Sequence, residues 1–148
     1  MTELAFESIV DCNPEELWEF HSDVRALKQL APKGTKIAIL GQITKVEEGA
    51  LHKIKISRFG ISMRWDARIT EVEPPHGFTD IAERSPFTYW RHRHEFKALG
   101  TGTQLRDRVN YAVPFGLIGK LLDRLLIRGA IKSMFRKRHK STVEHFSK

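Results

Sequence analysis

The stretch that decides the fold is YWRHRHEFKALGTGTQLRDRVNYAV, residues 89–113. In both halves of this stretch every second side chain is charged or polar, and the side chains between them are mostly apolar or aromatic. Alternation with a period of two indicates strands, and a short glycine-rich break between them indicates a hairpin. The stretch therefore predicts a strand at 89–97, a turn at 100–102 and a strand at 104–113, each with one dry face.

The dry faces of this hairpin also carry polar groups. The first strand places on that face Trp90, His92, His94 and Phe96. The second strand places there Leu105, Asp107, Val109, Tyr111 and Val113. Pairing Phe96 with Leu105 across the turn puts His94 opposite Asp107. We therefore expect a His94–Asp107 hydrogen bond inside an otherwise apolar surface.

Further elements surround the hairpin. Alternation is clearest in ISMRWDARIT, residues 61–70, and weaker strand patterns lie at 4–10, near 37–43, near 53–57 and at 78–84. Asn13 followed by Pro14 and two acids indicates a helix start. A second short helix is expected at about 24–30.

A long terminal helix is expected from about 117 to 145. Apolar residues recur there with helical spacing, at Ile118, Leu121, Leu122, Leu125 and Leu126. We expect Leu122 and Leu125 to close the sheet. Beyond Gly129 the apolar positions move to another face, which predicts a kink near Gly129 or a helix covered on two sides.

These elements predict an α+β fold in one domain spanning residues 1–148. A curved antiparallel sheet of about seven strands would wrap around the long C-terminal helix, with two short helices after the first strand. Such a strongly bent sheet often leaves a cavity between itself and the helix.

Composition and charge exclude several classes of protein. The chain has 148 residues, 41% hydrophobic and 29% charged, which is typical of a globular protein. The single cysteine, Cys12, excludes an internal disulfide and a multi-cysteine zinc site. The acidic N-terminal segment does not resemble a signal peptide and no apolar run is long enough for a membrane span, so we expect a cytoplasmic protein.

The excess positive charge is confined to the end of the chain. Residues 1–112 carry equal numbers of basic and acidic side chains, whereas residues 113–148 carry the whole net charge of +7. We interpret the basic run at 132–140 as the solvated end of a helix. The alternative is that it makes weak contact with an anionic membrane. Nucleic acid is not expected as a partner, because no aromatic side chains are interleaved with the basic ones to stack on bases.

Two motifs resemble those of a known family. The first reads F-x-D…PF-x-x-W-x-H-x-H-x-F and is matched by Phe78, Asp80, Pro86, Phe87, Trp90, His92, His94 and Phe96. The second reads G-T-x-L-x-D-x-V-x-Y-x-x-P-x-G-x-x-G and is matched by Gly102, Thr103, Leu105, Asp107, Val109, Tyr111, Pro114, Gly116 and Gly119. In these motifs the chain resembles the START/polyketide cyclase superfamily, also called SRPBCC, and most closely the type fused to epimerase-like short-chain dehydrogenases. It departs from that type at Ser85, where glycine is usual, and no dehydrogenase domain follows in this sequence.

The resemblance implies a helix-grip fold that binds a hydrophobic or amphipathic small molecule or lipid between sheet and helix. We expect a carrier or sensor without cofactor or metal, and the sequence leaves the oligomeric state open. The residues expected to contact the ligand are Trp65, Phe78, Trp90, His92, His94, Asp107, Tyr111, Leu122 and Leu125.

The inward histidine and aspartate leave other functions open. His94 and Asp107 could form a structural pair, anchor a polar ligand group, or act as a general acid–base pair in a cyclase or dehydratase. A metal bound by the two histidines would also require a converging acid such as Asp80 or Asp107. A further alternative is a peripheral lipid-transfer module that uses the basic terminal helix.

Overall fold

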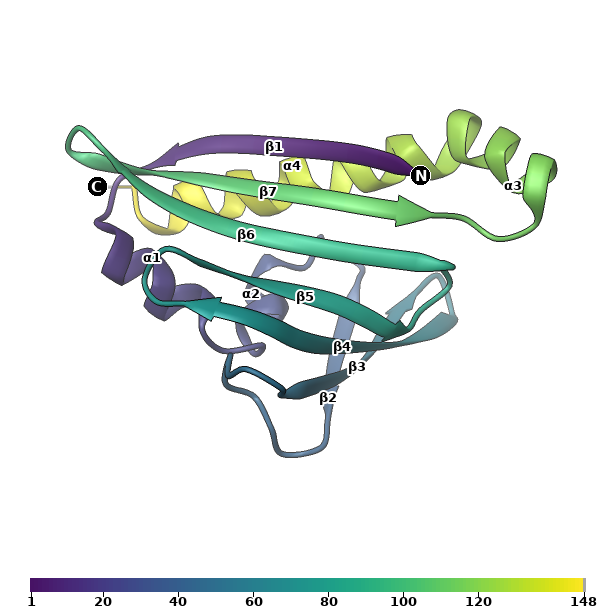
Figure 1. The fold of residues 1–148 in the computed structure, drawn as a ribbon, viewed down its shortest axis with the longest axis horizontal. Helices are drawn as coiled ribbons and strands as arrows, with labels where there is room; N and C mark the ends of the chain where they lie inside the picture. The colour runs from purple at the N-terminus through teal and green to yellow at the C-terminus, as the bar shows by residue number, and fades with distance from the viewer. Residues whose placement is uncertain (148) are drawn as a thin grey trace.

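The computed structural model describes residues 1–147, and its elements follow the expected order (Figure 1). The strands are β1 (Thr2–Val10), β2 (Lys36–Leu40), β3 (Leu51–Arg58), β4 (Ile61–Glu73), β5 (Gly77–Arg84), β6 (Tyr89–Leu99) and β7 (Gly102–Ala112). The helices are α1 (Pro14–His21), α2 (Ala26–Leu30), α3 (Gly116–Leu122), the π-helical turn η1 (Asp123–Ile127) and α4 (Arg128–His145).

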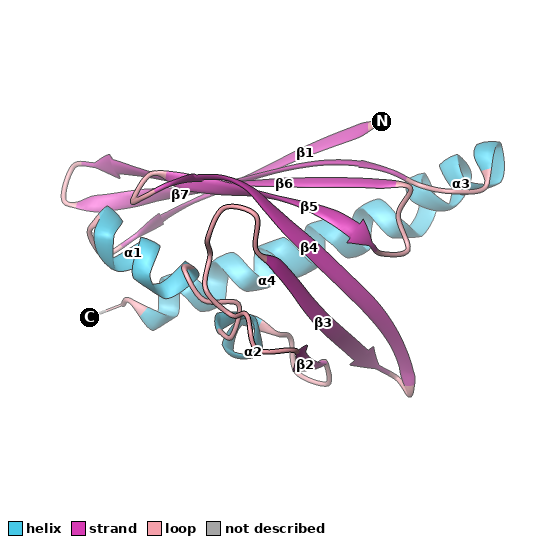
Figure 2. Cartoon of the chain, turned by 60° about the horizontal axis from the view of Figure 1, so that its bottom comes forward, coloured by secondary structure: helices cyan, strands magenta, loops and turns pink. Residues whose placement is uncertain are grey.

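The seven strands form one antiparallel sheet in the order β1-β7-β6-β5-β4-β3-β2. Register shifts between β4 and β5, at 66–67 and 69–71, mark irregular pairing, and such bulges bend a sheet. Figure 2 shows α1, α2 and α4 on the same side of this curved sheet. The arrangement is the α+β helix-grip fold that the sequence predicts.

The β6–β7 hairpin has the predicted register. Phe96 lies opposite Leu105, and His94 lies opposite Asp107. The dry faces are also confirmed, because Phe96, Leu105 and Asp107 are all buried. A short glycine-containing turn leaves little freedom of pairing, which is why the register could be counted from the sequence.

The first short helix begins as its sequence predicts. The Asn13 side chain accepts a hydrogen bond from the Glu16 backbone at 2.8 Å, and the Glu16 carboxylate accepts one from the Asn13 backbone at 3.3 Å. This capping box, with Pro14 at the first helical position, fixes the start of α1.

The C-terminal helix has two parts with different environments. α4 packs against the sheet through residues spaced by helical turns, namely Ile131, Phe135, His139 and Thr142. α3 continues beyond the end of β7 (Figure 1), and its leucines face solvent. In place of the kink expected near Gly129, a π-helical turn over 123–127 separates the two parts. A π turn inserts an extra residue into the helix. Residues at the same helical spacing therefore lie on different faces of the helix before and after the turn.

The expectation that Leu122 and Leu125 close the sheet is wrong. The two residues are 41% and 68% exposed, and only Leu122 reaches the edge of the cavity. The buried position of this segment is instead Asp123, which accepts hydrogen bonds from the Tyr111 hydroxyl at 2.6 Å and from Arg128 at 3.0 Å. The polar contact fixes α3 to the end of β7, and no strand lies beneath the leucines.

In the described part of the chain, two hydrophobic clusters contain most of the core residues. One lies near α1 and contains Val10, Leu17, Ile69, Phe78, Phe96 and Leu105. The other lies under α4 and contains Trp90, Val109, Tyr111, Ile131 and Phe135. Along β6 the two histidines therefore stand between Trp90 of one cluster and Phe96 of the other. Within residues 1–147, no helix combines the length and apolar character needed to cross a membrane.

Candidate functional site

A cavity of about 590 Å³ lies between the inner face of the sheet, α2 and the C-terminal helix. Six of the residues predicted to contact a ligand line it: Trp65, Phe78, Trp90, His92, His94 and Leu122. The other three do not. Asp107 lies behind the histidines, Tyr111 is fully buried against Asp123, and Leu125 faces solvent.

Aromatic side chains form one wall of the cavity. Trp65 and Trp90 meet edge to face with ring centroids 5.0 Å apart. Phe87, from the turn before β6, lies 4.9 Å from Trp90 and 5.9 Å from Trp65. These three rings present a rigid apolar surface suited to flat or aliphatic groups.

A buried hydrogen-bonded cluster faces the cavity beside this wall. Asp107 Oδ1 accepts a hydrogen bond from His92 Nε2 at 2.6 Å, and Asp107 Oδ2 accepts one from His139 Nε2 at 2.6 Å. His94 Nε2 donates to Asp80 Oδ2 at 2.8 Å. The expected partnership is therefore corrected: His94 is bonded to Asp80, and Asp107 is shared by two other histidines.

The charges of the cluster follow from burial and hydrogen bonding. Burial alone would raise the pKa of Asp107, but His92 and the hydrogen bond from His139 hold that pKa well below its ordinary value. Burial likewise acts to raise the pKa of Asp80, but the hydrogen bond from His94 together with the charges of His92, His94 and His52 lowers that pKa below its ordinary value. Burial, with His92 adding to it, lowers the pKa of His94. Both carboxylates are therefore ionised at neutral pH, and His94 is a neutral imidazole.

This protonation state explains the missing His94–Asp107 bond. His94 Nδ1 lies 3.4 Å from Asp107 Oδ1. Because the single ring proton of His94 is on Nε2, facing Asp80, Nδ1 carries a lone pair. Two acceptors that face each other form no hydrogen bond.

The sequence prediction missed several residues of the site, and three of them are polar side chains that bear on its chemistry. His139 was assigned to a solvated basic helix end, yet it is buried and its Nδ1 lies 2.7 Å from the Ser8 hydroxyl. Its spacing of eight from Ile131 and four from Phe135 was the available signal. His21 also lines the cavity, and burial lowers its pKa to about 4.

Arg138 is the third of these residues. Its side chain lines the cavity, and no residue within 1–147 forms a hydrogen bond or ion pair with its guanidinium. Burial lowers the pKa of Arg138, while Asp107 and Asp80 act against that change. A cationic fork on the cavity wall can receive a carboxylate, a phosphate or a carbonyl oxygen.

Among residues 1–147, Asp80, His92 and His94 form a group that could hold a metal ion, since one ligand atom from each lies within 4.8 Å of the others. The two imidazoles are stacked, with ring centroids 3.7 Å apart and an interplanar angle of 29°. An ion bound there would replace the proton that His94 Nε2 shares with Asp80, so the His94–Asp80 hydrogen bond would be lost.

Comparisons with solved structures show the same fold at low sequence identity. Protein CV1439 from Chromobacterium violaceum superposes with a TM-score of 0.78 at 14% identity, covering 99% of this chain and 97% of that one. TTHA0849 from Thermus thermophilus gives a TM-score of 0.71 at 18% identity, covering 99% of this chain and 100% of that one. Ara h 8.0201 gives a TM-score of 0.65 at 12% identity, covering 97% of this chain and 98% of that one.

The comparison with family models identifies the family directly. No curated protein matches the chain. The model of a family described as polyketide cyclase / dehydrase and lipid transport, however, matches residues 10–135. This match includes the aromatic wall, His92, His94 and Asp107, and it supports hydrophobic ligand binding in general. The chain therefore belongs to the polyketide cyclase / dehydrase and lipid transport family, within the SRPBCC superfamily that its motifs resemble.

Proposed function

We propose that the protein is a carrier or sensor that binds a hydrophobic or amphipathic small molecule in the cavity and releases it unchanged. The observation that carries this proposal is the cavity itself. Its volume of about 590 Å³ lies within the range of small-molecule sites, and its walls are mostly apolar with a few polar groups. In this proposal the protein binds its ligand in the cytoplasm.

The order of side chains along the cavity supports an amphipathic ligand. From the α3 end, β6 contributes first Trp90 and then the histidines. The C-terminal helix likewise contributes first Leu122 and later Arg138. An apolar tail would therefore lie toward α3, and a polar head would lie near His94 and Arg138.

A cavity-filling variant tests the proposal. Ala67 lines the cavity, so Ala67→Phe should remove space from it, whereas Ala98→Phe adds the same ring at an exposed position outside it. The probe is dansylaminoundecanoic acid, whose bound form should accept energy from Trp65 and Trp90. We expect saturable binding by the wild type and by Ala98→Phe, and at least about tenfold weaker binding by Ala67→Phe. Equal binding by all three proteins would contradict the proposal.

A second candidate function rests on the His94–Asp80 pair. In a cyclase or dehydratase, His94 would act as a general base with Asp80 holding its Nε2–H, once the ring turned Nδ1 from Asp107 toward the ligand. The two functions differ in the fate of the ligand. Mass spectrometry of a bound ligand before and after incubation should show an unchanged mass for a carrier. A mass or isomer change that His94→Gln abolishes, with binding retained, would establish the enzyme instead.

A further inference from the structure

The outer face of α3 and η1 is an exposed apolar ridge. The α3 ridge, as we name it, consists of Leu117, Ile118, Leu121, Leu122, Leu125 and Leu126. All six are exposed, with Leu117 reaching 83%. Their spacing puts them on one side of the helix, opposite the buried Gly119 and Asp123. A contiguous patch of six large apolar side chains far exceeds the scattered exposure usual on a protein surface.

A second exposed apolar region, at the tip of the β3–β4 hairpin, lies across the cavity mouth from the ridge. Phe59 and Ile61, at the tip of the β3–β4 hairpin, are exposed, Phe59 by 85%. Met63, two residues further along β4, lines the same cavity as Leu122. Figure 2 shows this hairpin tip and α3 toward the same end of the molecule. Met63, Phe115 and Leu122 line the cavity and are also exposed, so the cavity opens to solvent between these two apolar regions.

Two exposed phenylalanines adopt a backbone conformation that bulky residues avoid. Phe59 has φ 54° and Phe115, which also lines the cavity and is 80% exposed, has φ 70°. Left-handed φ values are unfavourable for residues with a Cβ. At Phe59 the two-residue β3–β4 turn requires the positive φ, a position that favours glycine or asparagine, and the phenylalanine found there presents an exposed apolar ring.

The charges around the ridge favour a particular partner. Lys120 and Arg124 are exposed on α3 and η1, and the one acid of this segment, Asp123, is turned inward and bonded to Arg128. Because Lys120 and Arg124 are the exposed charges of α3 and η1, a second copy of this chain docked on the ridge would bring the same two positive charges to the same place. An anionic lipid surface offers both the apolar phase and the opposite charge.

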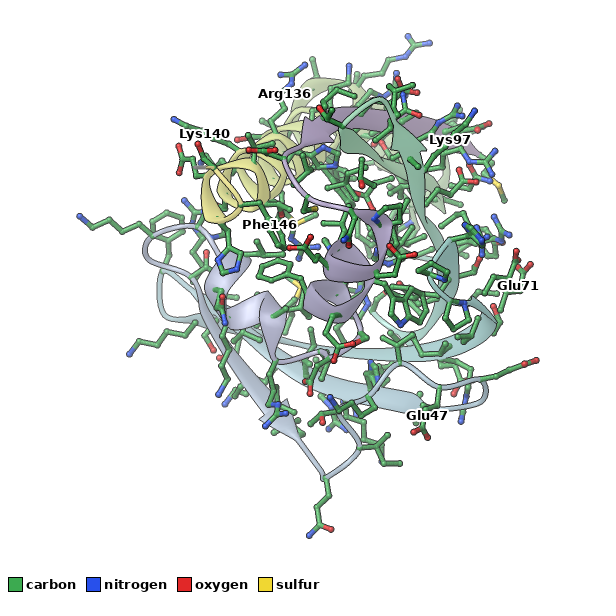
Figure 3. The ribbon with its side chains drawn as sticks, turned by 90° about the vertical axis from the view of Figure 1, so that its left-hand side faces the viewer. Glu47, Glu71, Lys97, Arg136, Lys140 and Phe146 are labelled. Atoms are coloured by element: carbon green, nitrogen blue, oxygen red, sulfur yellow. The ribbon has the colours of Figure 1, made fainter. Side chains whose placement is uncertain are left out.

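We propose that this end of the molecule docks on an anionic membrane, with the α3 ridge, Phe59 and Phe115 in the interfacial layer and the cavity mouth against the lipid. The docking site is thus not the run 132–140. In Figure 3, Arg136 and Lys140 lie on the outer side of α4 and Phe146 lies on its inner side. Arg136 and Lys140 belong to α4, well beyond the end of η1 at Ile127, whereas Lys120 and Arg124 belong to α3 and η1 themselves. Docking itself depends only on the α3 ridge, Phe59 and Phe115. Exchange of a ligand through the cavity mouth rests in addition on the proposed function.

Co-sedimentation of the full chain with lipid vesicles tests the docking. The vesicles are phosphatidylcholine with and without phosphatidylserine. The variant Leu117→Ser with Leu121→Ser removes ridge side chains, and Leu99→Ser is its control, because Leu99 is exposed in the β6–β7 turn at the opposite end (Figure 1). We expect binding to the anionic vesicles that falls with added salt, at least a tenfold loss in the ridge variant, and wild-type binding by Leu99→Ser.

Further variants separate the alternatives. Lys120→Gln with Arg124→Gln should weaken anionic binding, and Arg136→Gln with Lys140→Gln should leave it nearly unchanged. The docking proposal is overturned if the wild type ignores anionic vesicles, if the ridge variant binds as the wild type does, or if only the 136/140 variant loses binding. It is also overturned if sedimentation shows a dimer in solution that the ridge variant dissociates. Dansyl-acid binding, measured on each vesicle-free protein, reports separately whether the proposed function stands.

Discussion

The two parts of the C-terminal helix have similar apolar spacing and opposite environments. In α4 the residues at 131, 135, 139 and 142 are buried against the sheet, whereas in α3 and η1 the leucines from 117 to 126 face solvent. The difference arises because the last strand ends at Ala112, so that α3 projects past the sheet. Periodicity therefore identifies an apolar face, but the length of the neighbouring strands decides whether that face is core or interaction surface.

Truncating one large side chain in each part should give the largest contrast. Phe135 is fully buried and stacks on Phe6 with ring centroids 4.7 Å apart. Phe135→Ala should lower the free energy of unfolding by about 3–5 kcal/mol. Leu125→Ala should change it by less than about 0.5 kcal/mol. Urea unfolding followed by circular dichroism measures both, and comparable losses in the two variants would show that the ridge belongs to the core.

Neutralising the buried carboxylate tests the polar part of the α4 interface. Asp107→Asn keeps the shape but cannot accept two hydrogen bonds in the same way, so the variant should lose about 1–3 kcal/mol of unfolding free energy. Glu95→Gln is the matched change on the wet face of the same hairpin, where Glu95 pairs with Arg108 at 3.1 Å. That variant should lose at most about 1 kcal/mol. If Glu95→Gln costs as much as Asp107→Asn, the shared-carboxylate account fails.

Acidification should first lower the stability of the folded protein through its buried histidines. Burial lowers the folded-state pKa of His21 to about 4 and also lowers that of His94. Above an ordinary histidine pKa of about 6.5 their stabilising contribution is complete, and it is lost as the pH falls toward the folded-state values, because the unfolded chain then binds more protons. The melting temperature should therefore decrease from pH 7 to pH 5. His21→Gln should reduce that decrease, and an unchanged pH dependence in this variant would exclude His21 as a cause.

Because the pKa values of Asp80 and Asp107 are lowered in the folded state, these residues should affect the melting temperature only at still lower pH. Their contribution is complete above the ordinary aspartate pKa of about 3.9 and is lost below it, as the carboxylates are protonated in the folded state. A melting curve of Asp107→Asn should accordingly be less sensitive to pH below that point than the wild type. Parallel curves for the two proteins would contradict the hydrogen-bond pattern described for Asp107.

The smallest effect is expected on the outer side of α4. Arg136 and Lys140 are exposed and Arg138, two residues from each, lines the cavity. Arg136→Gln with Lys140→Gln should change unfolding by less than about 0.5 kcal/mol and should not affect binding of the dansyl acid. Arg138→Gln should weaken binding of the acid more than binding of its methyl ester. If Arg138→Gln weakens binding of the acid and of the ester equally, Arg138 does not bind the charged head group of the ligand.

The sequence was informative where contacts are local and uninformative where they are not. The β6–β7 register and the α1 cap could be counted from the chain because each depends on residues close in sequence. The hydrogen-bond partners of Asp107 could not be counted in this way. The register places His94 opposite Asp107, yet the donors are His92, the other histidine of that strand, and His139, from a helix 32 residues later. The exposure of Leu125 could not be predicted either, since it depends on where another element ends.

The central claim is that an apolar ligand enters the space between the sheet and the C-terminal helix. Of the three tryptophans, Trp65 and Trp90 line that space, whereas Trp18 packs on Phe78 and Phe96 and does not. The direct measurement is quenching of tryptophan emission by brominated dodecanoic acid. In Trp18→Phe, whose emission comes from the two cavity tryptophans, quenching should be strong and saturable. In Trp65→Phe with Trp90→Phe, where only Trp18 emits, it should be weak. Equal quenching in the two proteins, or none in Trp18→Phe, would contradict ligand binding in the cavity.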